Sequence, residues 1–118
     1  MNERTTLLQS LLVLDRPTAT ITAQLQTFPW DSDVPLVTLR GRDAKAVLQR
    51  YLSGELNREE IESWANALET REDVQLAPTD DQRLRAMLHE LANPILTREL
   101  TRITAEEWVR VLSDTAID

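Results

Sequence analysis

The sequence contains no cysteine, and its 118 residues include only two glycines and one histidine. The absence of cysteine excludes disulfides, thiolate nucleophiles and zinc sites built on sulfur, and it fits a reducing compartment. Loops that bind nucleotide phosphates need glycines that let the backbone approach the anion, and Gly41 and Gly54 do not form such a motif. We therefore expect no cofactor of the P-loop or Rossmann kind, and no other cofactor is indicated.

The single histidine, His89, lies between Leu88 and Glu90. A general base needs an oriented partner and a nucleophile, and the sequence has neither a Gly-x-Ser-x-Gly motif nor a cysteine to supply the nucleophile. A zinc site with one histidine would need several carboxylates arranged by the fold. We expect His89 to be a surface or boundary residue, with no catalytic residue and no metal ligand in the chain.

An acidic pair, Asp31 and Asp33, resembles the start of a calcium-binding EF-hand loop. That loop requires glycine at its sixth position and glutamate at its twelfth, where this sequence has Leu36 and Arg42. The calcium motif therefore fails, and the two aspartates are expected to cap local backbone amides after Trp30.

No long apolar run is present. The longest cluster, Leu11 to Leu14, is far shorter than the roughly 20 residues that cross a bilayer. The segment Met1 to Arg4 lacks a cluster of positive charge, and no small-residue cleavage site follows the leucines, so we expect no secretory signal and a cytoplasmic location. With 42% apolar and 28% charged residues, the composition is that of one globular domain over residues 1–118.

Two segments carry complete helix-start signals. Asn57 precedes Glu60 by three residues, and Leu56 can pack on Ile61, which predicts a capping box and a hydrophobic staple for a helix from Arg58 to Thr70. The same pattern recurs for a helix that runs to about Ser113. There Thr104 is the expected cap, Glu107 lies three residues later, and Ile103 can pack on Trp108. Both Trp64 and Trp108 fall on apolar stripes and are expected in the core.

Further helices follow from apolar spacing. The stretch Arg42 to Ser53 ends at Gly54, a common helix terminator, and is expected to form an antiparallel hairpin with Arg58 to Thr70. Helices are also predicted over Asp80 to Ala92, with Thr79 or Asp80 as cap, and over Thr5 to Leu14. Thr18 to Phe28 fits either a strand or a helix, and we favour a helix.

The predicted fold class is all-α, a compact single-domain bundle of about five helices built around the central hairpin. Leu36 to Leu39 can form a short edge strand, within a loop from Pro29 to Leu39. A second loop is expected from Arg71 to Thr79. No internal repeat and no low-complexity segment is visible.

Charge is distributed unevenly on a chain whose net charge is −7. Residues 38–54 carry a balance of +3 and residues 55–73 a balance of −5. One explanation is that the basic segment 38–54 and the acidic segment 55–73 attract each other and their outer faces are only solvated. The other is that the acidic segment forms a strip that recruits a basic partner by electrostatic steering. The residues of this acidic strip are Glu55, Glu59, Glu62, Glu69, Glu72 and Asp73.

Trp30 lies in a proline-flanked acidic loop. It can be an anchor tucked into the bundle or an exposed interface anchor, since tryptophan is enriched in binding hot spots. We include it among the candidate partner-binding residues.

The segment from Leu48 to Leu56, with Glu59 to Ala65 after it, resembles immunity proteins that neutralise bacteriocin nucleases of the colicin D kind. It resembles other small bacterial proteins equally. The likeness to immunity proteins implies a helical domain that presents acidic residues to a basic toxin, and it carries over no individual toxin-binding residue.

These patterns favour a non-enzymatic protein-binding module, of the immunity type, whose acidic helix engages a basic partner. The alternative is a regulatory or nucleic-acid-linked helical protein that places Arg40, Arg42, Lys45 and Arg50 on phosphate, although the net charge disfavours nucleic acid. An enzyme that uses carboxylates alone is a third hypothesis. Membrane binding is not expected, and the oligomeric state stays open.

Overall fold

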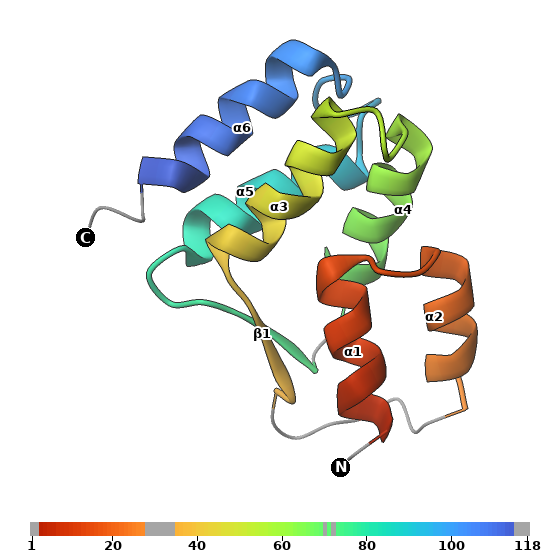
Figure 1. The fold of residues 1–118 in the computed structure, drawn as a ribbon. Helices are drawn as coiled ribbons and strands as arrows, with labels where there is room; N and C mark the ends of the chain where they lie inside the picture. The colour runs from red at the N-terminus through yellow and green to blue at the C-terminus, as the bar shows by residue number, and fades with distance from the viewer. Residues whose placement is uncertain (1–2, 28–34, 70, 72, 115–118) are drawn as a thin grey trace.

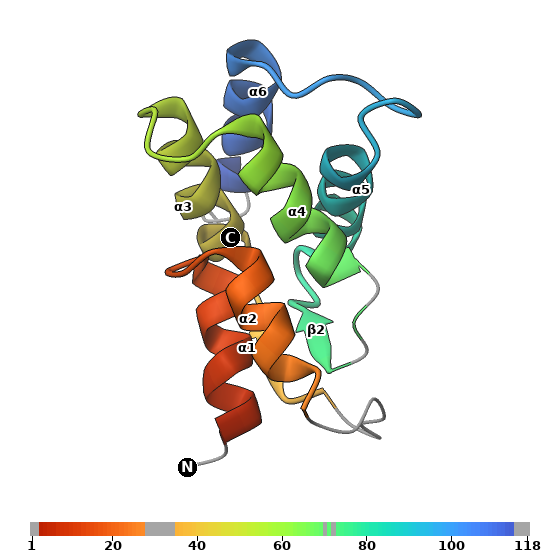
Figure 2. The ribbon, with the colours of Figure 1, turned by 90° about the vertical axis from the view of Figure 1, so that its right-hand side faces the viewer.

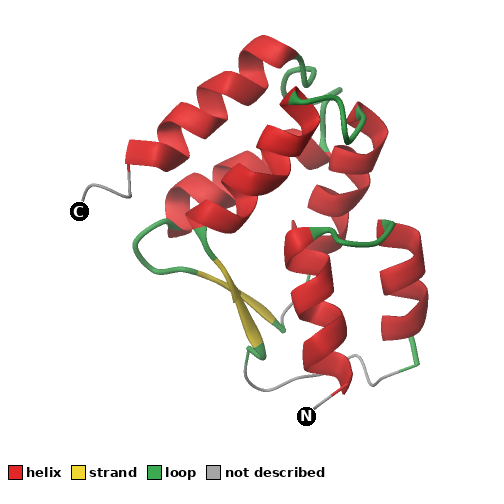
Figure 3. Cartoon of the chain, viewed as in Figure 1, coloured by secondary structure: helices red, strands yellow, loops and turns green. Residues whose placement is uncertain are grey.

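The computed structural model describes residues 3–27, 35–69, 71 and 73–114, which form six helices and two short strands. The helices are α1 (Glu3–Val13), α2 (Thr18–Leu25), α3 (Gly41–Leu52), α4 (Arg58–Glu69), α5 (Asp81–Ala92) and α6 (Arg102–Asp114), and the strands are β1 (Val37–Leu39) and β2 (Val74–Leu76) (Figure 1). The chain is mostly helical, as predicted, with one helix more than the number expected and a small sheet (Figure 3). The segment that begins at Thr18 is a helix, as favoured.

The helices pack in pairs. Helix α3 lies along α6 and α4 lies along α5, while α1 and α2 form a third pair (Figure 2). Contacts between α3 and α4 are few in comparison, so the prediction of a central hairpin is right in its short turn and wrong in its packing. Each of the two helices, α3 and α4, has one apolar stripe, and this stripe is buried mainly against a helix from later in the chain.

In the described ranges, no helix is both long enough and apolar enough to cross a bilayer.

The sheet consists of β1 and β2, which run parallel with Val37 opposite Val74 and Leu39 opposite Leu76. Strand β1 was expected, but β2 lies in the segment from Arg71 to Thr79 that was predicted as a loop. Parallel neighbours need a crossover connection, and α3, the turn and α4 together supply it. The segment predicted as a hairpin, α3 with its turn and α4, is therefore the crossover of a two-stranded sheet.

Side chains from all six helices and both strands form one apolar cluster. Trp64 is fully buried at its centre, as predicted, whereas Trp108 is half-buried and packs on the edge of the cluster. The indole N–H of Trp108 donates to the Glu90 carboxylate at 2.7 Å. The amphipathic stripes read from the sequence thus define the interior.

The start of α4 is the predicted capping box. The backbone N–H of Glu60 donates to Asn57 Oδ1 at 2.8 Å, and the backbone N–H of Asn57 donates to Glu60 Oε1 at 2.9 Å. Leu56 and Ile61, the proposed staple, are both buried. Gly54 ends the preceding turn with φ +87, in the left-handed region that favours glycine.

The start of α6 differs from the prediction. Thr101 caps the helix instead of Thr104, because the backbone N–H of Thr104 donates to Thr101 Oγ1 and that of Thr101 donates to Thr104 Oγ1. Ile103 is exposed and does not serve as a staple. The sequence holds two threonines three residues apart, and the structure uses the earlier one as the cap and the later one as its reciprocal partner.

The C-terminal end of α1 is held by two donors from other helices. The Trp64 indole N–H donates to the Leu11 carbonyl at 2.9 Å, and Arg50 Nη1 donates to the carbonyls of Val13 and Leu14 at 2.8 and 2.9 Å. The last carbonyls of a helix lack partners within the helix. Here the Leu11 carbonyl also accepts from the backbone N–H of Leu14 at 3.3 Å, and the Val13 carbonyl accepts from Arg50. The end of α1 is thereby fixed to both α3 and α4.

Replacing Asn57 with alanine removes the side-chain acceptor at the start of α4. We expect the free energy of unfolding to fall by about 1 kcal/mol, as for other N-cap deletions. Urea denaturation followed by circular dichroism measures the change. The matched control is Asn66→Ala on the exposed face of the same helix, which should be neutral or slightly stabilising because alanine is the better helix former. Equal losses in the two variants would contradict the capping role.

Replacing Trp64 with phenylalanine removes the donor to the Leu11 carbonyl and leaves space in the core. We expect the free energy of unfolding to fall by about 2 kcal/mol or more. Trp108→Phe is the comparison, with a smaller loss expected because the Glu90 carboxylate keeps its bond to Arg98. The same urea titration measures both variants, and a larger loss in Trp108→Phe would refute this ranking.

Candidate functional site

The predicted acidic strip does not form one surface. Asp73 is 2% exposed and lies between two arginines, with its Oδ2 3.0 Å from Arg4 Nη2 and its Oδ1 2.9 Å from Arg71 Nε. It ties the first turn of α1 to the start of β2. The prediction that Asp73 binds a partner is therefore wrong, because its carboxylate is consumed by a buried ion pair inside the fold.

The environment of Asp73 perturbs its acidity. Burial raises the pKa of Asp73, but hydrogen bonds and charge attraction from Arg71 and Arg4 outweigh that effect, so the pKa lies below its usual value. The carboxylate stays ionised in the folded protein and is a structural group.

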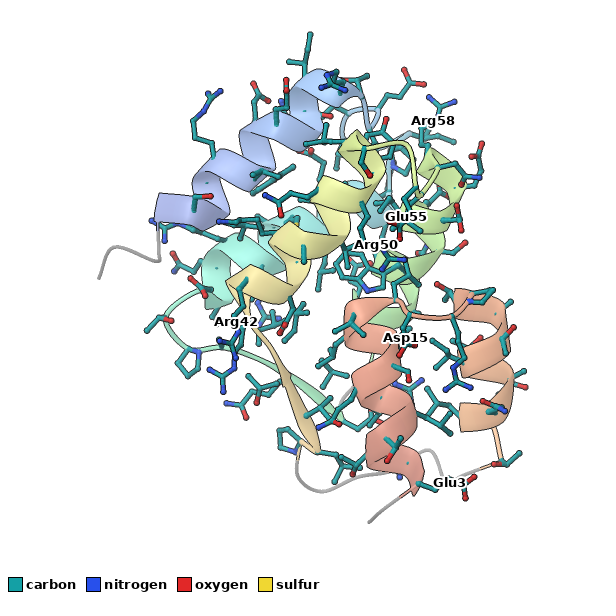
Figure 4. The ribbon with its side chains drawn as sticks, viewed as in Figure 1. Glu3, Asp15, Arg42, Arg50, Glu55 and Arg58 are labelled. Carbon is teal, nitrogen blue, oxygen red and sulfur yellow. The ribbon has the colours of Figure 1, made fainter. Side chains whose placement is uncertain are left out.

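Glu55 is exposed but has a partner within the chain. Its carboxylate accepts from Arg50 Nε, and the same arginine caps the end of α1 (Figure 4). Arg50 is thus engaged in three places and is not a free phosphate ligand, which weakens the hypothesis of a nucleic-acid-linked protein. Arg42 lies at the opposite end of α3 (Figure 4).

Glu69 lies at the far end of α4 from Glu55. Its Oε2 is 3.1 Å from His89 Nδ1. His89 is exposed, as predicted for a surface histidine. Glu72 and Trp30 were also predicted to bind a partner, and both lie outside the described residues.

The remaining two residues of the acidic strip, Glu59 and Glu62, line a groove of about 720 Å³ between the first half of α4 and the α5–α6 loop. We call it the α4 groove. Neither carboxylate has a hydrogen-bond or ion-pair partner among the described residues. The other lining residues are Arg58, Ala92, Asn93, Pro94, Ile95, Leu96 and Glu99.

The α5–α6 side of the α4 groove carries two large apolar side chains that are exposed to solvent. Ile95 is 97% exposed and Leu96 is 78% exposed, and they are the two most exposed large apolar residues of the described ranges. An ion pair between Arg58 and Glu99 joins α4 to this loop. The α4 groove therefore combines two carboxylates that have no partner among the described residues with two aliphatic side chains that are exposed to solvent.

The loop that carries Ile95 and Leu96 is fixed by local bonds. Thr97 Oγ1 donates to the carbonyls of Glu90 and Asn93, and Arg98 forms ion pairs with Glu90 and Glu107. The hydrogen bond to Glu90 is the main reason that the pKa of Arg98 is raised above its usual value. The exposed apolar residues are thus held on a braced loop.

Sequence reasoning missed the α5–α6 wall of the groove. Ile95 and Leu96 follow a proline directly after a helix and fit no helical stripe. That signal could have marked them as apolar residues without a place in the core. Their position opposite Glu59 depends on the α4–α5 packing, which the sequence does not reveal.

The described residues contain no group of three or more histidine, aspartate or glutamate side chains that could hold a metal ion.

No protein-family model matches the chain, and neither the curated proteins nor the solved structures include one with significant similarity. The likeness to colicin D immunity proteins is thus a resemblance in sequence pattern alone.

Replacing Asp73 with asparagine tests its buried ion pairs. We expect the free energy of unfolding at neutral pH to fall by about 3 kcal/mol, because two arginines then face a neutral amide in a buried position. The folded-state pKa is below the unfolded value of about 4, so the contribution is present above that value and is lost as pH falls through the folded pKa. Urea titrations from neutral to acidic pH measure it.

The difference in unfolding free energy between wild type and Asp73→Asn should accordingly shrink as the pH falls below about 4. Asp15→Asn is the control, because the Asp15 side chain is 55% exposed and its replacement should lower the free energy of unfolding by less than about 1 kcal/mol. A constant difference across the whole pH range would contradict this account of Asp73.

Proposed function

We propose that this chain is a non-enzymatic protein-binding module whose α4 groove engages a basic partner. The observation that carries the proposal is the meeting of unpaired carboxylates and exposed aliphatic side chains in one groove. Glu59 and Glu62 supply the charge, and Ile95 and Leu96 supply the apolar contact. This combination suits a partner segment with arginine or lysine beside a large apolar residue.

Charge favours the encounter. The chain carries a net charge of −7, so a basic partner is attracted from a distance and a second acidic protein is repelled. Among the described residues, Glu59 and Glu62 have no partner to displace, unlike Glu55 and Asp73. A cation that binds them therefore competes only with water.

Apolar contact favours a lasting complex. Monomeric proteins rarely expose neighbouring large aliphatic side chains, and such positions are frequent at interfaces. The braced α5–α6 loop limits the backbone freedom that Ile95 and Leu96 would lose on binding. Less entropy is lost when a preorganised surface binds.

The resemblance of residues 48–56 and 59–65 to immunity proteins suggests the class of partner. Such a protein covers a basic surface of a toxin, which requires acidic side chains that are free to pair. We propose a basic toxin as the partner, and the basic proteins encoded beside this gene are the first to be tested.

The test compares Glu59→Lys/Glu62→Lys with Ile95→Ser/Leu96→Ser in calorimetric titrations against each purified basic candidate. The charge-reversal variant should raise the Kd by a factor of about 10 to 100 at low salt and lose most of the salt dependence. The serine variant should raise the Kd by about 10-fold or more and keep the salt dependence.

The matched control is Glu3→Lys/Glu106→Lys, which makes the same change in net charge at two exposed positions outside the α4 groove. Glu3 lies at the opposite end of the molecule from Arg58 (Figure 4). The control should change the Kd by less than about 3-fold. Equal weakening by the control and the groove variant would show that net charge alone attracts the partner, and unchanged binding in both groove variants would refute the site.

A further inference from the structure

Strand β2 has one edge paired and one edge open. Val37 N–H donates to the Asp73 carbonyl and Ala77 N–H donates to the Leu39 carbonyl, so the main-chain groups of Gln75 also face β1. Main-chain groups alternate in direction along a strand, and those of Val74 and Leu76 consequently point away from β1. None of the described residues forms a hydrogen bond to them on that side.

A groove of about 390 Å³ runs along this open edge, between the end of α4 and the start of α5. Leucines from both helices and Pro78 form its apolar lining, and Gln75 is exposed beside it. Of the two residues whose main-chain groups point away from β1, Leu76 is half-buried and Val74 is 9% exposed, so within the described ranges solvent reaches the open edge only through this groove. Open strand edges are templates for pairing with another strand.

We propose that β2 pairs with β2 of a second copy of this chain, antiparallel, around a two-fold axis that passes beside Gln75. In this register, Val74 of one copy faces Leu76 of its partner copy, and each such pair exchanges two main-chain hydrogen bonds. The two-fold axis repeats the exchange on the other side. The two sheets join into one of four strands.

Self-pairing at this place is consistent with the charges. The open-edge groove is lined by Glu69, Arg71, Asp81 and Arg85, two acids and two bases. The chain as a whole carries −7, so two copies repel over most of their surface, whereas this patch is neutral.

Gln75 suits the position on the axis. Directly opposed residues in an antiparallel pair lie on the same face, so the two Gln75 side chains meet. A carboxamide both donates and accepts, and it can therefore pair with its own copy. A charged residue at this position would face the same charge on the other copy, and the two would repel each other.

The open edge and the α4 groove lie at opposite ends of α4, so neither surface covers the other. Dimerisation through β2 is independent of the proposed function. The two can succeed or fail separately.

Sedimentation velocity of the full chain, from low concentration to about 1 mM, tests the proposal with wild type, Gln75→Glu and Gln75→Lys. We expect wild type to form a dimer as concentration rises and both variants to stay monomeric, because either charge faces its like across the axis. Gln49→Glu and Gln49→Lys, on the exposed face of α3, are the matched controls and should dimerise as wild type does.

A covalent test is also available because the chain has no cysteine. Opposed residues of this pair type lie about 4.5 Å apart at Cα, within the range of a disulfide. Gln75→Cys should form a disulfide-linked dimer under mild oxidation with dissolved oxygen, which accepts the two electrons and two protons released, while Gln49→Cys should do so at least about 10-fold more slowly. Circular dichroism checks that each variant is folded.

Three results would overturn the proposal. They are a wild-type chain that stays monomeric at every concentration, a dimer that survives both charge variants, and a dimer that only one sign of charge dissociates. Equal rates of disulfide formation at positions 75 and 49 would also count against it.

Discussion

Hydrogen bonds at the C-terminal end of α1 join this helix to α3 and α4. Trp64 reaches it from α4 and donates to the Leu11 carbonyl, and Arg50 reaches it from α3 and donates to the carbonyls of Val13 and Leu14. Leu14, the residue after the helix, adopts φ +53, a conformation that costs about 1 kcal/mol for a side chain of this kind. Burial of Leu14 in the core and the bond from Arg50 to its carbonyl offset that cost.

This junction also determines which acidic residues are free. Arg50 holds α1 and also pairs with Glu55, so one carboxylate of the acidic strip is used inside the fold. Arg4 and Arg71 use Asp73 in the same way. Glu59 and Glu62 have no such partner among the described residues, and both line the α4 groove.

Features set by neighbouring residues could be predicted from the sequence. The capping box of Asn57, the left-handed Gly54 and the amphipathic stripes of α3 and α5 depend on spacings of a few residues, and all are present. The start of α6 was placed three residues late because Thr101 and Thr104 both offer a capping oxygen. Local chemistry alone does not choose between them.

Features set by distant residues could not be predicted. The three residues of β2 are too few to show a strand period, and the strand exists because β1 lies beside it. Asp73 is indistinguishable in sequence from the exposed acids near it, since its partner Arg4 is 69 positions away. For the same reason, the meeting of Glu59 with Ile95 and Leu96 became visible only in the folded chain.

The pairing of α3 with α6 has a consequence for how the chain is made. Helix α3 buries its apolar stripe largely against a helix that begins at Arg102, some fifty residues later. During synthesis, Ala44, Val47 and Leu48 therefore stay partly uncovered after β1, β2 and the α4–α5 pair can already form. A ribosome that stalls before residue 102 would leave a nearly complete molecule with an aggregation-prone flank, the kind of surface that chaperones bind.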